Sequence, residues 1–347
     1  MPERPPVDGT PAERPAADYP SLSSGERTVG AGRPASAGTE PPASAGAEAT
    51  AAVASVLGAP QEERREEPQE GERTRSPDTS WPPWSAALAL IGGLVLAAVA
   101  GLIVDVPALL LGAELSSSHT PPGLAIADTV VQDVAFVAAA VYCAQLGGRA
   151  VRSWQFGLRR PGAGWRHAAR LIFALLLIFI VLSVVWSELL NPTKEKLLEQ
   201  LGSNEGAALL VLSAALTCVV APICEEFLFR GYIFTALRNW HGTWPAAVIT
   251  GLLFGGVHVG SAPVLDLVPL AGLGFGLCLL YRFTGSLYPS IVAHSLNNSL
   301  AFSSLENWGW QTPVLMVAAL LGIGAVALAC KRVGLIAPDA PVARPGT

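Results

Sequence analysis

Long apolar runs alternate with short polar segments over most of the chain after residue 80. Eight of these runs are apolar enough for membrane-crossing helices, which need about 20 residues, although the run at 244–259 is short. We therefore predict an all-α fold, a polytopic membrane bundle of about eight transmembrane helices. The predicted spans cover residues 84–111, 124–146, 171–190, 207–238, 244–259, 264–281, 286–304 and 312–329.

The first 80 residues have the opposite pattern. They are rich in Pro, Ala, Gly, Ser, Glu and Arg, and the sequence PASAG occurs twice, at residues 34–38 and 42–46. Such a segment has too little apolar surface to offset the entropy cost of ordering it. We predict a disordered tail over 1–80, N-terminal transmembrane helices over 81–204, a core over 205–304, and a last helix with a C-terminal tail over 305–347.

Composition and charge agree with an integral membrane protein. The chain is 51% hydrophobic and 14% charged, whereas soluble proteins carry about 25% charged residues. The basic segment at 149–170 predicts a cytoplasmic loop by the positive-inside rule, which places the N-terminal tail in the cytoplasm. With eight spans, Arg238, Arg282 and Lys331 fall on that same side. High Ala, Gly and Pro usage indicates a GC-rich prokaryotic genome, so we expect a prokaryotic plasma membrane. We expect the lipid bilayer as a partner and no nucleic acid.

Charged residues interrupt the fourth predicted span. Charge at such depth costs about 2.5–3.5 kcal/mol per group on insertion scales, which makes it a candidate functional site. Glu226 and Arg230 are four residues apart, so they share a helix face and are predicted to pair. Glu225 points about 100° away from that pair and is left to face something else. Asp128 and Asp133 in the second span are expected to orient neighbours or to face a cavity.

Polar residues also interrupt two further predicted helices. His258 lies in the fifth span, and His294 and Asn298 share a face of the seventh. A rise of about 1.5 Å per residue places these side chains and Glu225 in one depth band, about 12–21 Å from the cytoplasmic helix ends. Pro222 removes a helical hydrogen bond and displaces the carbonyl of the fourth residue before it. A kink just before Glu225 is therefore expected, with room for water.

These four side chains suit a water-activating site. A glutamate away from bulk water is suited to act as a general base near neutral pH. Amide hydrolysis passes through an oxyanion, for which His294 and Asn298 are plausible donors. A metal site is the alternative: Glu225, His258 and His294 are candidate ligands for Zn²⁺ or another divalent metal, which would acidify a bound water.

The three motifs resemble those of the CPBP family, whose names include type II CAAX prenyl protease and bacteriocin-processing, or Abi, intramembrane protease. They read EEFLFR from Glu225 to Arg230, FGGVH ending at His258, and HSLNN from His294 to Asn298. The resemblance implies an intramembrane endopeptidase that cleaves a membrane-associated or prenylated-type peptide. It assigns water activation to Glu225 with His258, support of the site to His294 and Asn298, and bracing of the helix to Glu226 and Arg230. Both metal-dependent and glutamate mechanisms have been described for the family.

Two other functions fit the same polar residues. Ionisable groups at mid-membrane also serve proton relays, so a transporter or proton-coupled carrier is one alternative. A non-catalytic membrane scaffold or immunity-type protein of the same fold is the other. Solute flux in liposomes would indicate a carrier, and a cellular phenotype that survives Glu225→Gln would indicate a scaffold.

Overall fold

The computed structural model describes residues 81–113, 120–146, 148, 150–190 and 206–336. The predicted disordered tail at 1–80 and the end of the C-terminal tail lie outside these residues. The division of the chain into domains therefore stays a prediction.

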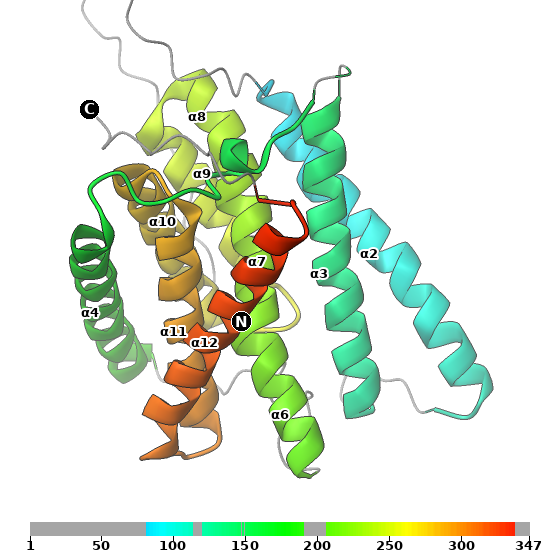
Figure 1. Cartoon of the computed structure of the whole chain (residues 1–347). Coiled ribbons are helices and arrows are strands. Elements are labelled where there is room, and N and C mark those ends of the chain that lie inside the picture. The colour runs from blue at the N-terminus through cyan, green and yellow to red at the C-terminus, as the bar shows by residue number, and fades with distance from the viewer. Residues whose placement is uncertain (1–80, 114–119, 147, 149, 191–205, 337–347) are drawn as a thin grey trace, which may run out of the picture. The chain divides into compact units, whose positions relative to one another are not determined.

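The described part is helical throughout and contains no β-strand, which confirms the all-α prediction (Figure 1). Eight helical rods are present among these residues, and the fourth is built from five consecutive segments. The rods are α2 (Trp84–Leu110), α3 (Pro122–Gln145), α4 (Trp165–Leu190), the rod Ala207–His241, α9 (Thr243–Gly256), α10 (Leu267–Thr284), α11 (Leu287–Leu305) and α12 (Gln311–Arg332). The fourth rod runs through α6 (Ala207–Ala215), η2 (Leu216–Val220), α7 (Ala221–Glu226), η3 (Phe227–Phe234) and α8 (Thr235–His241).

Six of these described rods are long and apolar enough to cross a membrane. The other two are α9, which has 14 residues, and α11, whose 19 residues include several polar ones. A helix of 14 residues is about 21 Å long, short of a hydrocarbon core of about 30 Å. The helix in the fifth predicted span ends at Gly256, three residues before the predicted end at Val259. The 35-residue fourth rod is longer than a bilayer requires.

The fourth rod lies in the middle of the described part. Its η3 segment packs against α2, α3, α9, α10 and α11. In Figure 1, α2 and α3 lie together on one side of this rod, and α4 lies on the other side, against α10 and α11. Residues that are distant in sequence thus surround the acidic motif at the junction of α7 and η3.

The helical geometry changes just before the acidic motif, where a kink was predicted; the structure has a π-helical turn there. Pro222 lies in the first turn of α7, and the five residues before α7 form a π-helical turn, η2. The carbonyl oxygen of Cys218, four residues before Pro222, accepts a hydrogen bond from Ser295 Oγ at 2.5 Å. A side chain of α11 thus satisfies the backbone group that the proline frees.

Glycine lets α9 and α10 approach closely. A Cβ atom built on Gly255 would lie 2.6 Å from Leu267 O, and one on Gly251 would lie 2.8 Å from Ala271 O. Neither distance is tolerable for a side-chain carbon, so only glycine fits. Gly256, by contrast, has no atom within 4 Å of such a Cβ.

Candidate functional site

Glu226 and Arg230 form the predicted ion pair, and both side chains are fully buried. Arg230 Nη1 lies 2.6 Å from Glu226 Oε1. Arg230 also donates from Nη2 to Gly274 O of α10 at 2.8 Å, and its guanidinium lies 4.5 Å from the centroid of the Phe254 ring. These further contacts offset part of the desolvation cost of the buried pair, while Arg230 Nε and Glu226 Oε2 have no hydrogen-bond partner among the described residues. The pair therefore braces α7 internally and also joins it to α10 and α9.

His294 lies between the two glutamates. Its Nδ1 is 2.9 Å from Glu226 Oε1, and its Nε2 is 3.9 Å from Glu225 Oε2. A carboxylate paired with arginine acts as an acceptor, so the Nδ1 atom of His294 carries the hydrogen in this contact. The Nε2 atom then faces Glu225. Glu226 thus orients His294 as well as bracing the helix, a role that the sequence spacing did not predict.

His258 lies in the turn after α9, not inside a helix as predicted. Its Nδ1 is 2.8 Å from Phe254 O. Because a carbonyl oxygen only accepts hydrogen bonds, Nδ1 is the donor and Nε2 is left with its lone pair. Ser261 Oγ donates to the His258 carbonyl at 3.1 Å and holds the turn. The Phe254 ring packs against both imidazoles, at centroid distances of 5.1 Å from His258 and 5.5 Å from His294.

Asn298 contacts the fourth rod at the π-helical turn. Its Nδ2 donates to Thr217 O at 3.0 Å, three residues along α11 from the Ser295 contact to Cys218 O. The side-chain amide has two hydrogens, so one remains for a contact in the cavity. Asn298 therefore has a structural role that the sequence did not indicate, because the π-helical turn that it satisfies is not visible in hydropathy.

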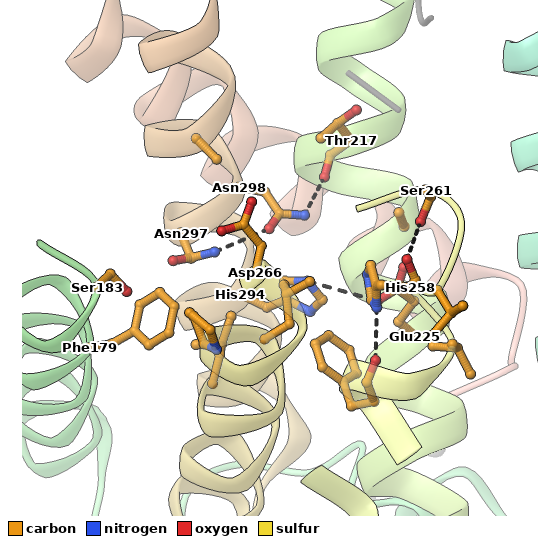
Figure 2. Close-up of a pocket in the computed structure, with 18 of the residues that line it drawn as sticks. Phe179, Ser183, Thr217, Glu225, His258, Ser261, Asp266, His294, Asn297 and Asn298 are labelled. Carbon is orange, nitrogen blue, oxygen red and sulfur yellow. Dashed lines mark hydrogen bonds and ion pairs between the residues drawn. The ribbon is translucent and has the colours of Figure 1, made fainter. Parts of the chain in front are cut away.

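One cavity joins these side chains (Figure 2). It has a volume of about 450 Å³, and its wall includes four of the six predicted site residues: Glu225, His258, His294 and Asn298. Glu226 and Arg230 lie behind the wall. Helices α3, α4, α9 and α10 and the π-helical turn η2 supply further lining residues, together with the loop between α9 and α10. Polar lining residues that sequence reasoning missed are Thr129, Gln132, Ser183, Ser187, Thr217, Ser261, Asp266 and Asn297.

Most of these missed residues carry no sequence signal, because distant helices bring them to the cavity. Asn297 is the exception, since it is the neighbour of Asn298 within the third motif. Asp133 was noted in the sequence and is also buried near the site, where it interacts electrostatically with Glu225. Neither of its carboxyl oxygens has a hydrogen-bond partner within the described residues.

Glu225 has an acceptor available for a ligand. Its side chain is 13% exposed, and its Oε2 atom is buried with no hydrogen-bond partner among the described residues. A buried acceptor of this kind is costly unless a donor reaches it. The cavity offers space for that donor, such as a water molecule or a substrate group.

The donor chemistry at the cavity suits a metal ion, but the spacing in this arrangement is wider than a metal site needs. Glu225 supplies a carboxylate, and His258 and His294 present Nε2 atoms, which are typical zinc ligands. Among the residues described, however, no group of three or more His, Cys, Asp or Glu side chains is close enough together to hold a metal. The metal ligands therefore stay a prediction.

Comparison with known proteins bears on the core of the chain. Residues 207–300 match the family model described as "Type II CAAX prenyl endopeptidase Rce1-like". The match confirms the resemblance seen in the three motifs. It covers the fourth rod, α9, α10 and most of α11, which are the elements that carry Glu225, His258, His294 and Asn298. No solved structure matches the chain.

Three bacterial relatives are similar over parts of their length. "Putative membrane peptidase YdiL" of Bacillus subtilis is 33% identical over 88 residues, which are 25% of this chain and 35% of that protein. An uncharacterized protein of Mycoplasma capricolum is 31% identical over 93 residues, 26% of this chain and 27% of its own. The "UPF0177 protein YxdF" of Lactococcus lactis is 24% identical over 161 residues, 44% of this chain and 88% of its own. This chain thus spans about a third or less of the first two relatives.

Proposed function

We propose that this integral membrane protein is an intramembrane endopeptidase that hydrolyses a peptide bond with water activated by Glu225. One observation carries the proposal: Glu225, His258 and His294 face a single cavity that lies among apolar helices. The similarity of residues 207–300 to type II CAAX prenyl endopeptidases supports it. Charged and polar groups are costly at such depth, and a site that needs water and a base accounts for them.

In the proposed reaction, the carboxylate of Glu225 accepts a proton from water while the water oxygen attacks the peptide carbonyl carbon. The carbonyl π-bond opens to an oxyanion. The intermediate collapses with cleavage of the carbon–nitrogen bond, and the proton held by Glu225 passes to the leaving amine. His258 Nε2 accepts a hydrogen bond from the other O–H of the water and so holds the water against Glu225. A general base in such a position contributes about 10²–10⁴-fold to the rate.

His294 and Asn298 are proposed to support the oxyanion. Glu226 accepts the hydrogen bond from His294 Nδ1, so Nε2 at the cavity wall can donate to the oxyanion only when the ring carries a hydrogen on both nitrogens. Asn298 keeps one amide hydrogen beyond the one bound by Thr217 O. The 3.9 Å separation of His294 Nε2 and Glu225 Oε2 is longer than a hydrogen bond. Catalytic contacts commonly tighten in the substrate complex.

A divalent metal is the alternative cofactor. Glu225, His258 and His294 would hold it, and it would acidify a bound water. Metal analysis of the purified protein tests this. Metal bound at one equivalent by the wild type and lost in His258→Ala supports a metalloprotease, and wild-type activity in metal-free protein contradicts it.

For substrate and location, we propose a membrane-associated peptide or protein and a prokaryotic plasma membrane, with the N-terminus in the cytoplasm. The basic residues near the cytoplasmic helix ends support the orientation. A cysteine introduced at Ala163, an exposed position between α3 and α4, should react with impermeant thiol reagents only in inverted vesicles. Reaction in right-side-out vesicles would reverse the orientation.

The proposed function is tested by comparing membrane proteomes of cells with wild type and Glu225→Ala. Uncut forms of one or a few membrane proteins should accumulate in the variant, and purified wild-type protein should cut them. Equal proteomes, together with equal activity or inactivity of both proteins on a broad peptide panel, would contradict proteolysis. Solute flux in liposomes would then indicate a carrier, and a phenotype retained in Glu225→Gln would indicate a scaffold.

A further inference from the structure

Acidic side chains line the described cavity without any Lys or Arg. Two carboxylates line it, those of Glu225 and Asp266, and no Lys or Arg is among the described lining residues. Arg230 is bound to Glu226 and Gly274 O and does not reach the cavity wall. A carboxylate away from water is stabilised by an opposite charge. The described residues supply no such charge within this cavity, so a ligand that carries one is favoured.

The side chain of Asp266 makes no helix-capping contact among the described residues. It ends the short 3₁₀ helix η4 (Val264–Asp266) and occupies the N-cap position of α10, where aspartate usually caps the helix through its side chain. Here the side chain makes no capping hydrogen bond. Within the described residues its carboxylate has no hydrogen bond or ion pair. Figure 2 shows it among the residues that line the pocket.

The position of Asp266 is nevertheless fixed. Trp186 Nε1 of α4 donates to Leu265 O at 2.9 Å, which holds the preceding residue against the neighbouring helix. The same loop between α9 and α10 carries His258, and the contact from Ser261 holds that end. Asp266 and His258 are eight residues apart in one braced loop. A group bound by Asp266 is therefore held in a defined position relative to His258.

The apolar part of the cavity wall suits a long aliphatic side chain with a charged end. Phe179 and Trp186 of α4 and Leu270 of α10 line the same cavity. Lysine and arginine bury their methylene stems against such apolar surfaces and keep the charged group at a polar partner. Aromatic rings add a favourable interaction with the cation.

We propose that Asp266 is a specificity-determining residue that binds a Lys or Arg side chain of the peptide substrate within this cavity. The inference rests on the proposed proteolytic function and narrows its substrate class to peptides with a basic residue near the cleaved bond. A free N-terminal amine carries the same charge and is distinguished by the test.

The test uses the full-length protein in liposomes and a set of N-terminally acetylated membrane peptides. The peptides share one apolar sequence and differ at a single site that holds Lys, Arg, Gln or Glu. Cleavage by the wild type and binding to Glu225→Gln are both measured, because binding does not require turnover. An unacetylated Gln peptide reports on the free amine. Glu306→Gln, which removes one acidic residue outside the cavity, is the matched control.

We expect the Lys and Arg peptides to bind and react better than the Gln peptide by about 10- to 100-fold, the range of one charge-assisted hydrogen bond. Asp266→Asn should lose this preference, Asp266→Lys should favour the Glu peptide, and Glu306→Gln should keep the wild-type preference. A merely structural role for Asp266 would not reverse the preference.

Three results would overturn the inference: no preference in the wild type, a preference unchanged in Asp266→Asn, or a free-amine peptide that binds as well as the Lys peptide. The two proposals fail in different ways. Cleavage without a charge preference leaves proteolysis standing and removes the role of Asp266. Binding that depends on Asp266, without cleavage of any peptide, supports the cation site and contradicts proteolysis.

Discussion

The segment η3 and the helix α4 are both strongly apolar, yet their surroundings differ. Seven of the eight residues of η3 are buried, whereas one of the 26 residues of α4, Ala168, is buried among those described. The side chains of α4 are therefore free to meet lipid over most of the helix surface, while those of η3 meet other helices. Lipid tails are as apolar as leucine, so hydrophobicity does not separate the two environments. The buried charged pair does distinguish the two environments, because Arg230 needs partners that lipid cannot supply.

Arg230→Ala should have the largest effect on stability. It leaves Glu226 buried without its cation, which costs about 3–5 kcal/mol. Thermal unfolding of the purified protein in detergent measures this. Arg332→Ala, at the exposed end of α12, is the matched control and should lie within about 0.5 kcal/mol of wild type. Equal losses in the two variants would remove the distinction between the buried rod and the periphery.

A pair of leucines tests the difference between η3 and α4 directly. Leu228 in η3 is fully buried, and Leu182 in α4 is 61% exposed. Leu228→Ala should cost stability near the low end of about 2–5 kcal/mol, because the packing contacts are lost but lipid still accepts apolar groups. Leu182→Ala should change stability by less than about 0.5 kcal/mol. The same unfolding measurement compares the two variants. A larger loss of stability for Leu182→Ala would indicate that α4 packs against another protein surface.

The adjacent glycines of α9 test close helix packing. Gly255→Ala forces a Cβ atom against Leu267 O and should cost about 1–3 kcal/mol of stability. Gly256→Ala has open space and should be neutral or slightly stabilising, since alanine favours helices. Unfolding temperatures that are lowered equally would show that α9 and α10 are farther apart than described.

The smallest of these stability effects is expected at the π-helical turn. Ser295→Ala removes the hydroxyl that satisfies Cys218 O and should cost about 1 kcal/mol, as other membrane hydrogen bonds do. Ser304→Ala, at an exposed position of the same helix, is the control. If the two variants unfold at the same temperature, the carbonyl of Cys218 does not need the hydrogen bond from Ser295.

The fold was largely predictable because hydropathy reports lipid contact, and the described part of the chain has eight rods where eight runs were expected. The Glu226–Arg230 pair was predictable from helical spacing alone. The positions of Glu225, His258, His294 and Asn298 around one cavity were suggested by their common depth.

Other features depend on contacts between helices and left no local signal. The contact of His294 with Glu226 joins residues 68 positions apart. Asn298 and Ser295 satisfy carbonyl groups exposed by a π-helical turn, and a proline predicts a disturbed helix without saying what repairs it. Asp266 lies unremarked within the predicted span 264–281, and its place in the cavity follows only from the fold.

The central claim is that two adjacent glutamates have different tasks, and one paired measurement tests it. Cleavage rate and unfolding temperature are determined together for Glu225→Gln and Glu226→Gln in the full-length protein, with Glu306→Gln as the control. We predict that Glu225→Gln unfolds at the wild-type temperature but cleaves about 10²–10⁴-fold more slowly. Glu226→Gln should unfold at a clearly lower temperature, because it disrupts the contacts to Arg230 and His294. Wild-type cleavage by Glu225→Gln, or equal destabilisation of both variants, would contradict this division of roles.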